Sequence, residues 1–313
     1  MRRGLVLGAG GVLGASWTIG ALVAVQEAYG WDPREAEVLI GTSAGSVLAS
    51  VLGCGVGVDS LLNHQRGLPD ELTIDYDLDN DSGGARPPLP RPGFGSPRGM
   101  ISSALHPRRT TPMTALSAVL PRGRGSMEPV GRLVDAVLPG GGWAPHPATW
   151  VVATDYDRGR RVAFGRPGAP VAALRDAVMA SCSIPSWYAP RRIDGRRYVD
   201  GGTCSPTSVD LVLPLELDEV VVLSPMTSLS YDEPRSVGAQ VERRLRRLVT
   251  RRLVQEVKKV AAAGTRVTLL GPGAEDLMAI GANLMDPSRR SRVLDTSLRT
   301  SAEALRRGEQ ASA

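Results

Sequence analysis

Short apolar runs recur near the start of the chain, and each is followed by glycines and then by a segment with helical spacing. The first run, 4–7, leads into the glycine loop 8–14 and then into apolar positions at helical intervals over 15–29. The second run, 38–40, leads into a glycine-containing turn and a helix of small residues over 46–52. Apolar runs bounded by glycine predict buried strands, and their alternation with helices predicts a parallel sheet with helices on its faces.

The rest of the chain continues this alternation and shows no internal repeat. We expect, in chain order, helices over 113–120 and 129–138, strands over 150–155 and 161–165, a helix over 174–181, strands over 197–200 and 218–224, a helix over 237–263 and a strand over 266–270. No linker divides the sheet. The sequence therefore predicts one α/β domain over 1–313, with three α/β/α layers and a mostly parallel central sheet.

The segment 67–128 departs from this pattern. Residues 70–81 carry six acidic side chains and no basic one, and 86–98 alternate proline, glycine and arginine. Long segments without periodicity are usually functional or mobile loops. We therefore expect a mobile insertion over 67–128, either a lid over an apolar groove or a plain disordered loop. We also expect a loosely attached tail from about residue 290.

Composition narrows the class of protein. Hydrophobic residues make up 42% of the 313 positions and charged residues 22%, so the chain can bury a core and is not a disordered protein. No apolar run approaches the roughly 20 residues that cross a bilayer, and the first run is too short for a secretory signal. Cys54, Cys182 and Cys204 are too few and too scattered for a disulfide framework or a zinc site. We expect a cytoplasmic enzyme.

The net charge of +5 arises in the segment 236–259, which holds eight basic residues and two glutamates. Because the rest of the chain is close to neutral, the charge does not indicate a partner nucleic acid. Apolar residues recur at helical spacing among these basic residues. We favour a surface helix packed on the sheet; the alternative is a basic helix that contacts an anionic membrane. In the alternative, the residues that meet lipid are Arg243, Arg247, Arg251 and Lys258.

The pentapeptide 41–45 reads Gly-Thr-Ser-Ala-Gly and lies between a predicted strand and a predicted helix. This is the context of a nucleophile elbow, in which a sharp turn holds a serine out of the sheet. Gly41 and Gly45 would permit the turn, and Ser43 would lie at the positive end of the next helix. The alternative is a glycine-rich turn in which Ser43 only caps a helix.

The histidines do not offer an obvious base for Ser43. His64, His106 and His146 lie within or beside loop-like, proline-rich sequence, and no histidine follows residue 146. The order serine, acid, histidine that α/β-hydrolases use is therefore absent. We expect a carboxylate to act directly as the base.

Asp200, followed by Gly201 and Gly202, supplies a candidate carboxylate. A short strand-like run ends in this acid, and the two glycines allow the backbone to pass close to another element. The alternative is an ordinary Asp-Gly turn, which is the better interpretation of the tripeptide taken by itself.

The glycine loop 8–14 is a candidate anion site. Successive backbone N–H groups at a helix start form a concavity that can hold an oxyanion or a pyrophosphate. Gly8, Gly10 and Gly14 fit a variant of the dinucleotide fingerprint, and one alternative is therefore a dinucleotide-binding oxidoreductase. That fold requires an acid at the end of the second strand, where this chain has the turn of Ser43, so the oxidoreductase is the weaker interpretation.

In combination and order, these motifs resemble those of the patatin-like phospholipases. The segment 9–14 resembles their oxyanion loop, 41–45 their elbow, 200–202 their Asp-Gly-Gly motif and 180–185 the block before it. The resemblance implies a patatin-like fold, with Ser43 as nucleophile, Asp200 as its base, the amides of Gly10, Gly11 and Val12 as oxyanion donors, and Gly41, Gly45, Gly201 and Gly202 as supporting glycines.

The resemblance also implies a lipid acyl hydrolase, of phospholipase A or carboxylesterase type, that needs no cofactor and no metal. Its partner would be a lipid or acyl-ester substrate. The expected location is cytoplasmic, and peripheral contact with an anionic membrane belongs to the alternative interpretation of the basic segment 236–259. Two positions depart from the family pattern, since Leu13 replaces the usual Arg or Lys and Ala9 replaces the first glycine. Because Leu13 carries no charge, a catalytically silent lipid-binding module is a further alternative.

Overall fold

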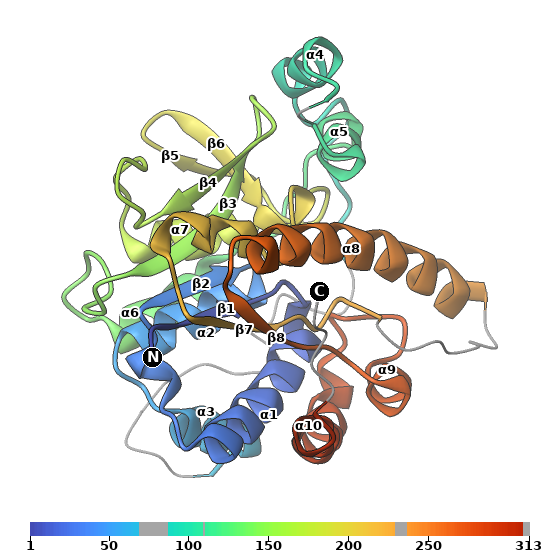
Figure 1. Ribbon diagram of the computed structural model, residues 1–313. Helices are drawn as coiled ribbons and strands as arrows, with labels where there is room; N and C mark the ends of the chain where they lie inside the picture. Colours follow the sequence, from blue (N-terminus) through green and yellow to red (C-terminus); the bar gives the residue numbers. More distant parts are fainter. Residues whose placement is uncertain (69–86, 109, 229–236, 309–313) are drawn as a thin grey trace.

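A mixed β-sheet lies at the centre of the protein (Figure 1). The computed structural model describes residues 1–68, 87–108, 110–228 and 237–308. The strands within these ranges are β1 (Arg3–Leu7), β2 (Val38–Thr42), β3 (Thr149–Asp155), β4 (Arg160–Phe164), β5 (Arg191–Ile193), β6 (Arg196–Asp200), β7 (Glu219–Leu223) and β8 (Arg266–Leu270). Their order is β5-β6-β3-β2-β1-β7-β8, and β4 pairs with β3 outside this path.

Strands β3, β2, β1, β7 and β8 run parallel to one another. Strands β4 and β6 both pair with β3 in the antiparallel sense, and β5 pairs with β6 in the same way. The sheet is therefore mostly parallel, as the sequence predicts, with an antiparallel region at the end that carries β6.

Helices surround this sheet. They are α1 (Gly11–Tyr29), α2 (Ala44–Gly53), α3 (Val58–Arg66), α4 (Pro97–Leu105), α5 (Pro112–Val119), α6 (Glu128–Val137), α7 (Leu174–Ser181), α8 (Val237–Ala262), α9 (Ala274–Ile280) and α10 (Arg290–Arg306), with short 3-10 turns at Pro33–Glu35, Gly201–Thr203, Val209–Leu215 and Pro287–Arg289. Among the helices that the structure describes, none combines the length and the apolar character needed to cross a membrane.

Alternate side chains of the central strands face opposite layers of helices. Leu5 and Leu7 of β1 pack in one cluster with residues of α1, α2 and α10, whereas Val6 packs in another with residues of α8. Every residue of β2 and β7 is buried, as expected of parallel strands that are covered on both faces. The predicted three-layer α/β/α fold is thus confirmed.

Helix α8 lies along one face of the sheet (Figure 1), where it buries Leu253, Val257 and Val260. This is the packed surface helix that the sequence favours. Arg243, which the membrane-contact alternative placed against lipid, is instead buried and paired with Glu242. The alternative was wrong about Arg243 because helical spacing alone does not show which positions of a helix other segments cover.

The segment from residue 290, expected to be a loosely attached tail, is part of one of the helical layers. Helix α10 packs along α1 (Figure 1), and Val293 and Leu294 are fully buried in the core cluster that also contains β1. The Ser297 hydroxyl donates a hydrogen bond to Trp17 O at 2.6 Å. The expectation was wrong because the apolar stripe of α10 is narrow and is hidden among arginines and other polar residues.

Helices α4 and α5 occupy part of the insertion 67–128 and pack against each other away from the centre of the sheet (Figure 1). Several of their large apolar side chains are exposed, among them Ile101, Leu105 and Leu116. The acidic stretch 70–81 lies outside the described residues. That the insertion is mobile and acts as a lid stays a prediction.

Candidate active site

Ser43 lies in the sharp turn between β2 and α2. Its φ of 52° is uncommon for a residue with a side chain and marks local strain. A Cβ at Gly45 would lie 2.1 Å from Leu7 O, and one at Gly41 would lie 2.4 Å from Gly45 O. Both positions therefore require glycine, because the turn passes directly against the backbone of β1 and of α2.

The pairing of strands along β3 brings Asp200 next to this turn. Thr42 of β2 pairs with Val152, and Asp200 of β6 pairs with the next residue of β3, Ala153. Since β4 occupies the other edge of β3, β6 continues along the edge that β2 leaves. Ser43 and Asp200 are therefore neighbours in space although they are far apart in the sequence.

The Ser43 hydroxyl lies beside the Asp200 carboxylate and acts to lower the pKa of that carboxyl, and both side chains are buried. Burial raises the pKa of Asp200 from 3.8 to about 6, while the Ser43 hydroxyl and the hydrogen bond from the Gly202 N–H, 2.7 Å from Oδ1, act in the opposite direction. The carboxylate is consequently ionised at neutral pH but more basic than an ordinary aspartate. Such a group is suited to accept a proton from a hydroxyl.

Three consecutive amides at the start of α1, those of Gly10, Gly11 and Val12, have no acceptor among the described residues. The amides on either side, those of Ala9 and Leu13, donate to carbonyls of distant loops. Amides in the first turn of a helix lack partners within the helix and lie at the positive end of its dipole. Because Gly10 and Gly11 line the same cavity as the serine of the elbow, these amides can receive a negatively charged oxygen.

Gly201 and Gly202 turn the chain immediately after Asp200. A Cβ at Gly201 would lie 2.3 Å from Val152 O, so this position has room only for hydrogen. The Gly202 N–H fixes one carboxylate oxygen of Asp200. The two glycines therefore orient the carboxylate toward the turn that carries Ser43.

Two serines at and just after the end of α7 hold the backbones of both candidate residues, and sequence reasoning assigned them no role. Ser181 Oγ accepts a hydrogen bond from Ser43 N–H at 2.8 Å and donates one to Val152 O at 2.6 Å. Ser183 O accepts a hydrogen bond from Asp200 N–H at 2.9 Å. The resemblance to a family motif marked this block, but only the structure shows that it links β2 with β6.

An apolar cavity of about 340 Å³ opens over Ser43 and Asp200. This volume falls within the range of about 300–1,000 Å³ that is usual for ligand pockets. Helices α5 and α8 and the loop after α9 supply much of its wall. The lid hypothesis had placed the insertion that contains α5 over an apolar groove, but nothing in the sequence connected α8 or the loop after α9 with the site. Their apolar lining residues include Met113, Leu116, Leu120, Leu245, Val249 and Met285.

The described lining of this cavity includes no histidine. His146 lies elsewhere, with its Nε2 2.8 Å from Ala36 O. In the described ranges of the chain, no three His, Cys, Asp or Glu side chains are grouped so that they could hold a metal ion. Asp200 is the carboxylate that lines this cavity together with Ser43.

Leu13 does not contribute to the wall of this cavity. Its side chain is fully buried in the core cluster of α1 and the central strands. The replacement of the usual basic residue therefore leaves the row of free amides in place. The Leu13 side chain also does not enter the cavity over Ser43.

Comparison with known proteins shows which family the chain matches. The model of the family described as patatin-like phospholipase matches residues 5–213, more than half of the chain. Among solved structures, the crystal structure of VipD from Legionella pneumophila is similar at 13% sequence identity and a TM-score of 0.46, over 98% of this chain and 67% of that chain. The cavity residues on α8 and in the loop after α9 lie outside the range that the family model matches.

Proposed function

Because the chain belongs to the patatin-like phospholipase family, we propose that it hydrolyses a carboxylic ester of a lipid through an acyl-enzyme on Ser43, with Asp200 as the base. Membership of the family supports lipid acyl hydrolysis as the general activity. The finer proposal rests on one observation: Ser43 and the buried Asp200 carboxylate lie side by side on one cavity, next to a row of amides without described acceptors.

In the first half of the reaction, Ser43 Oγ attacks the carbonyl carbon of the ester and transfers its proton to Asp200. The carbonyl oxygen becomes negatively charged and is stabilised by the amides of Gly10, Gly11 and Val12. Collapse of the tetrahedral intermediate breaks the bond to the alcohol oxygen. Asp200 donates its proton to that oxygen, the alcohol leaves, and the acyl group stays on Ser43.

In the second half, a water molecule takes the place of the alcohol. Asp200 accepts a proton from the water, whose oxygen attacks the acyl carbon in the same oxyanion site. When the bond to Ser43 breaks, the proton on Asp200 returns to Oγ. A raised carboxylate pKa assists both halves, because the group must accept a proton and release it again in each.

Labelling with a fluorophosphonate tests the proposed nucleophile. The reagent should modify the native protein at Ser43, identified by peptide mass spectrometry, and should fail to modify the heat-denatured protein or Ser43→Ala. A panel of p-nitrophenyl esters and phospholipids should show turnover that is lost in step with labelling. If the native protein is neither labelled nor active on any ester, the silent lipid-binding module replaces the hydrolase.

Activity should fall on acidification with a midpoint near pH 6. Asp200 acts only when ionised, and burial raises its pKa to about 6, so protonation below that pH removes the base. The measurement is kcat/KM for a neutral soluble ester between pH 4.5 and 8.5, with circular dichroism at each pH to show that the protein stays folded. A profile that stays flat down to pH 4.5 would contradict the role of Asp200.

The apolar cavity and α8 together suit a lipid substrate at a surface, and we propose a cytoplasmic enzyme with peripheral contact with anionic membranes. Leu245 and Val249 of α8 line the cavity, while the basic residues on the outer side of the helix are exposed. Anionic lipid attracts such basic residues by about 1 kcal/mol each near the surface. The exposed basic residues of α8 are Arg244, Arg247, Arg251, Lys258 and Lys259.

Reversing the charge of Arg244, Arg247 and Arg251 to glutamate should weaken binding to anionic vesicles, and added salt should reduce the difference. Sedimentation with vesicles of phosphatidylserine and phosphatidylcholine measures the binding. Neutral vesicles serve as the control, and hydrolysis of a soluble ester reports on the integrity of the active site. Equal binding of wild type and variant to anionic vesicles would leave α8 with a packing role only.

A further inference from the structure

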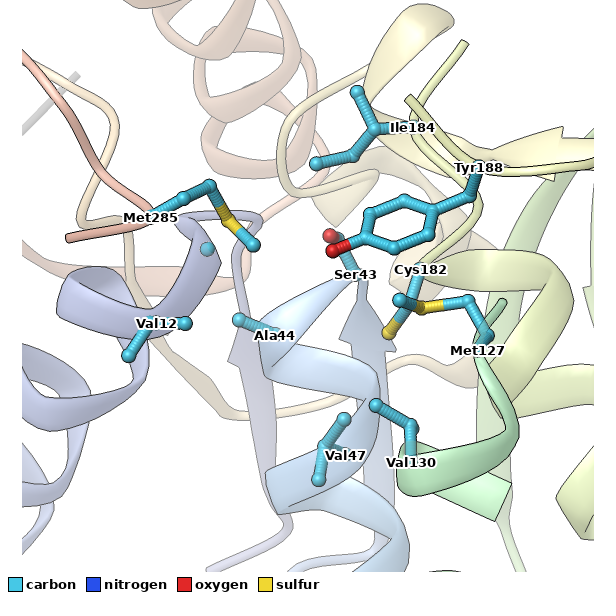
Figure 2. Close-up of a pocket in the computed structure, with 11 residues that line it drawn as sticks. Val12, Ser43, Ala44, Val47, Met127, Val130, Cys182, Ile184, Tyr188 and Met285 are labelled. Atoms are coloured by element: carbon cyan, nitrogen blue, oxygen red, sulfur yellow. The ribbon is translucent and has the colours of Figure 1, made fainter. Parts of the chain in front are cut away.

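A second, smaller cavity meets the first at Ser43. Its volume is about 100 Å³, and it extends from the serine between the N-terminal turns of α1 and α2 toward α6 (Figure 2). Figure 2 shows Val47 of α2 and Val130 of α6 on the side of this cavity away from Ser43. Its wall is largely apolar and includes Val12, Ala44 and Met127.

The two cavities differ in their relation to Asp200. Asp200 and Gly202 line the large cavity, whereas the described lining of the small cavity contains neither. The base must deliver its proton to the oxygen of the departing alcohol. That oxygen, and the alcohol attached to it, must therefore lie on the side of Asp200, which is the side of the large cavity.

The oxyanion site fixes the direction of a second bond at the reacting carbon. In the tetrahedral intermediate this carbon is bonded to Ser43 Oγ, to the oxyanion, to the alcohol oxygen and to the first carbon of the acyl chain. The amides of Gly10, Gly11 and Val12 receive the oxyanion, and the large cavity receives the alcohol. The fourth bond leads to the acyl chain, and the apolar space that remains next to Ser43 for this chain is the small cavity.

We propose that the small cavity binds the acyl chain and restricts it to short chains, while the large cavity binds the alcohol part; this division rests on the proposed function. An apolar cavity of about 150 Å³ holds benzene, with its six carbons. A cavity of about 100 Å³ therefore has room for about four carbons beyond the carbonyl. The preferred substrates are esters of short acyl chains with large apolar alcohols.

Two series of esters test the division. The first varies the acyl group of p-nitrophenyl esters from acetyl to dodecanoyl, and the second varies the alcohol of butanoate esters from methyl to octyl. Wild type should prefer acyl chains between butanoyl and hexanoyl. In the second series, kcat/KM should rise with the length of the alcohol.

Val130→Phe should fill the small cavity and lower the ratio of kcat/KM for hexanoyl over acetyl esters by at least about tenfold, because a single methylene in an apolar pocket accounts for about that factor. Val47→Ala should enlarge the small cavity and raise the ratio of kcat/KM for octanoyl over acetyl esters. This second variant keeps the proposal testable if Val130→Phe fails to fold. Neither variant should move the preference in the alcohol series.

Leu116→Trp on α5 is the matched change in the large cavity. It should alter the ratio for octyl over methyl butanoate and leave the preferred acyl length in place. The division is overturned if the variants at Val130 and Val47 move the alcohol preference instead, or move neither. Absence of both ester turnover and Ser43 labelling in wild type is a different result, because it overturns the proposed function itself.

Discussion

Replacing Asp200 with asparagine should lower kcat by about 10²–10⁴-fold, the range that is usual for loss of a general base. Asparagine keeps the shape of the side chain, and its carbonyl oxygen can still accept the hydrogen bond from Gly202 N–H. The amide cannot accept the proton of Ser43, so attack on the ester loses its assistance. Steady-state hydrolysis of a short-chain p-nitrophenyl ester measures the loss, and Ser43→Ala should abolish turnover altogether.

The same variant should be at least as stable as wild type at pH 8. The pKa of Asp200 is raised in the folded protein from 3.8 to about 6, so the folded state holds this proton more tightly than the unfolded state does. Ionisation of the buried carboxylate therefore lowers the stability of wild type above pH 6, and asparagine removes that effect. The advantage of the variant in thermal unfolding should shrink as the pH falls from 6 to 4.

Asp276→Asn provides a matched control for Asp200→Asn. Asp276 is also buried, burial also raises its pKa, and its Oδ1 accepts a hydrogen bond from the Thr300 hydroxyl in the packing of α9 on α10. This control should retain activity. A folded Asp200→Asn enzyme with near-normal kcat would rule out the Ser43–Asp200 pair, and the next variant to measure would replace all three histidines.

Replacing Gly11 with alanine should lower kcat by about 10²–10³-fold, as expected when one oxyanion donor is displaced. The φ of Gly11 is +61°, and an added Cβ would lie 2.9 Å from Met285 Sδ and 3.0 Å from Leu284 O. The chain at this position must shift, and the shift moves the amides of the loop away from the developing negative charge. Because the oxyanion forms only during the reaction, KM should change much less than kcat.

Gly30→Ala separates this effect from simple backbone strain. Gly30 ends α1 with a φ of +52°, and no atom lies within 4 Å of the position that its Cβ would take. Both variants place alanine in a left-handed conformation and should lower the melting temperature, but only Gly11→Ala should lose activity. Normal kcat in a folded Gly11→Ala variant would remove this loop from the proposed mechanism.

Much of the fold could be predicted from the sequence because it depends on local demands of the backbone. Buried strands are short runs of apolar residues, and β7 and β8 lie where such runs occur. The turn of Ser43 is marked by Gly41 and Gly45, because no other residue fits where the turn touches β1 and α2. The candidate nucleophile could therefore be named from five residues and the elements on either side of them.

The failures of prediction concern contacts between distant segments. The attachment of α10 depends on a few buried positions such as Val293 and Leu294, which look ordinary in an arginine-rich helix. The membrane-contact alternative placed Arg243 at a lipid surface, and it is buried instead. A side chain's exposure is decided by what packs over it, and the residues of its own helix do not contain that information.

The sequence by itself determined the type of sheet, the turn that carries Ser43 and the position of the glycine loop 8–14, because a tight turn that requires glycine can be recognised from the residue types alone. Only the tertiary structure decided that Asp200 enters the edge of β3 that β2 leaves, and that Ser181 and Ser183 hold the two together. It also decided the shape of both cavities. Their walls come from common apolar residues of five or more separate segments, and the sequence does not show which of these residues will contact one another in the folded chain.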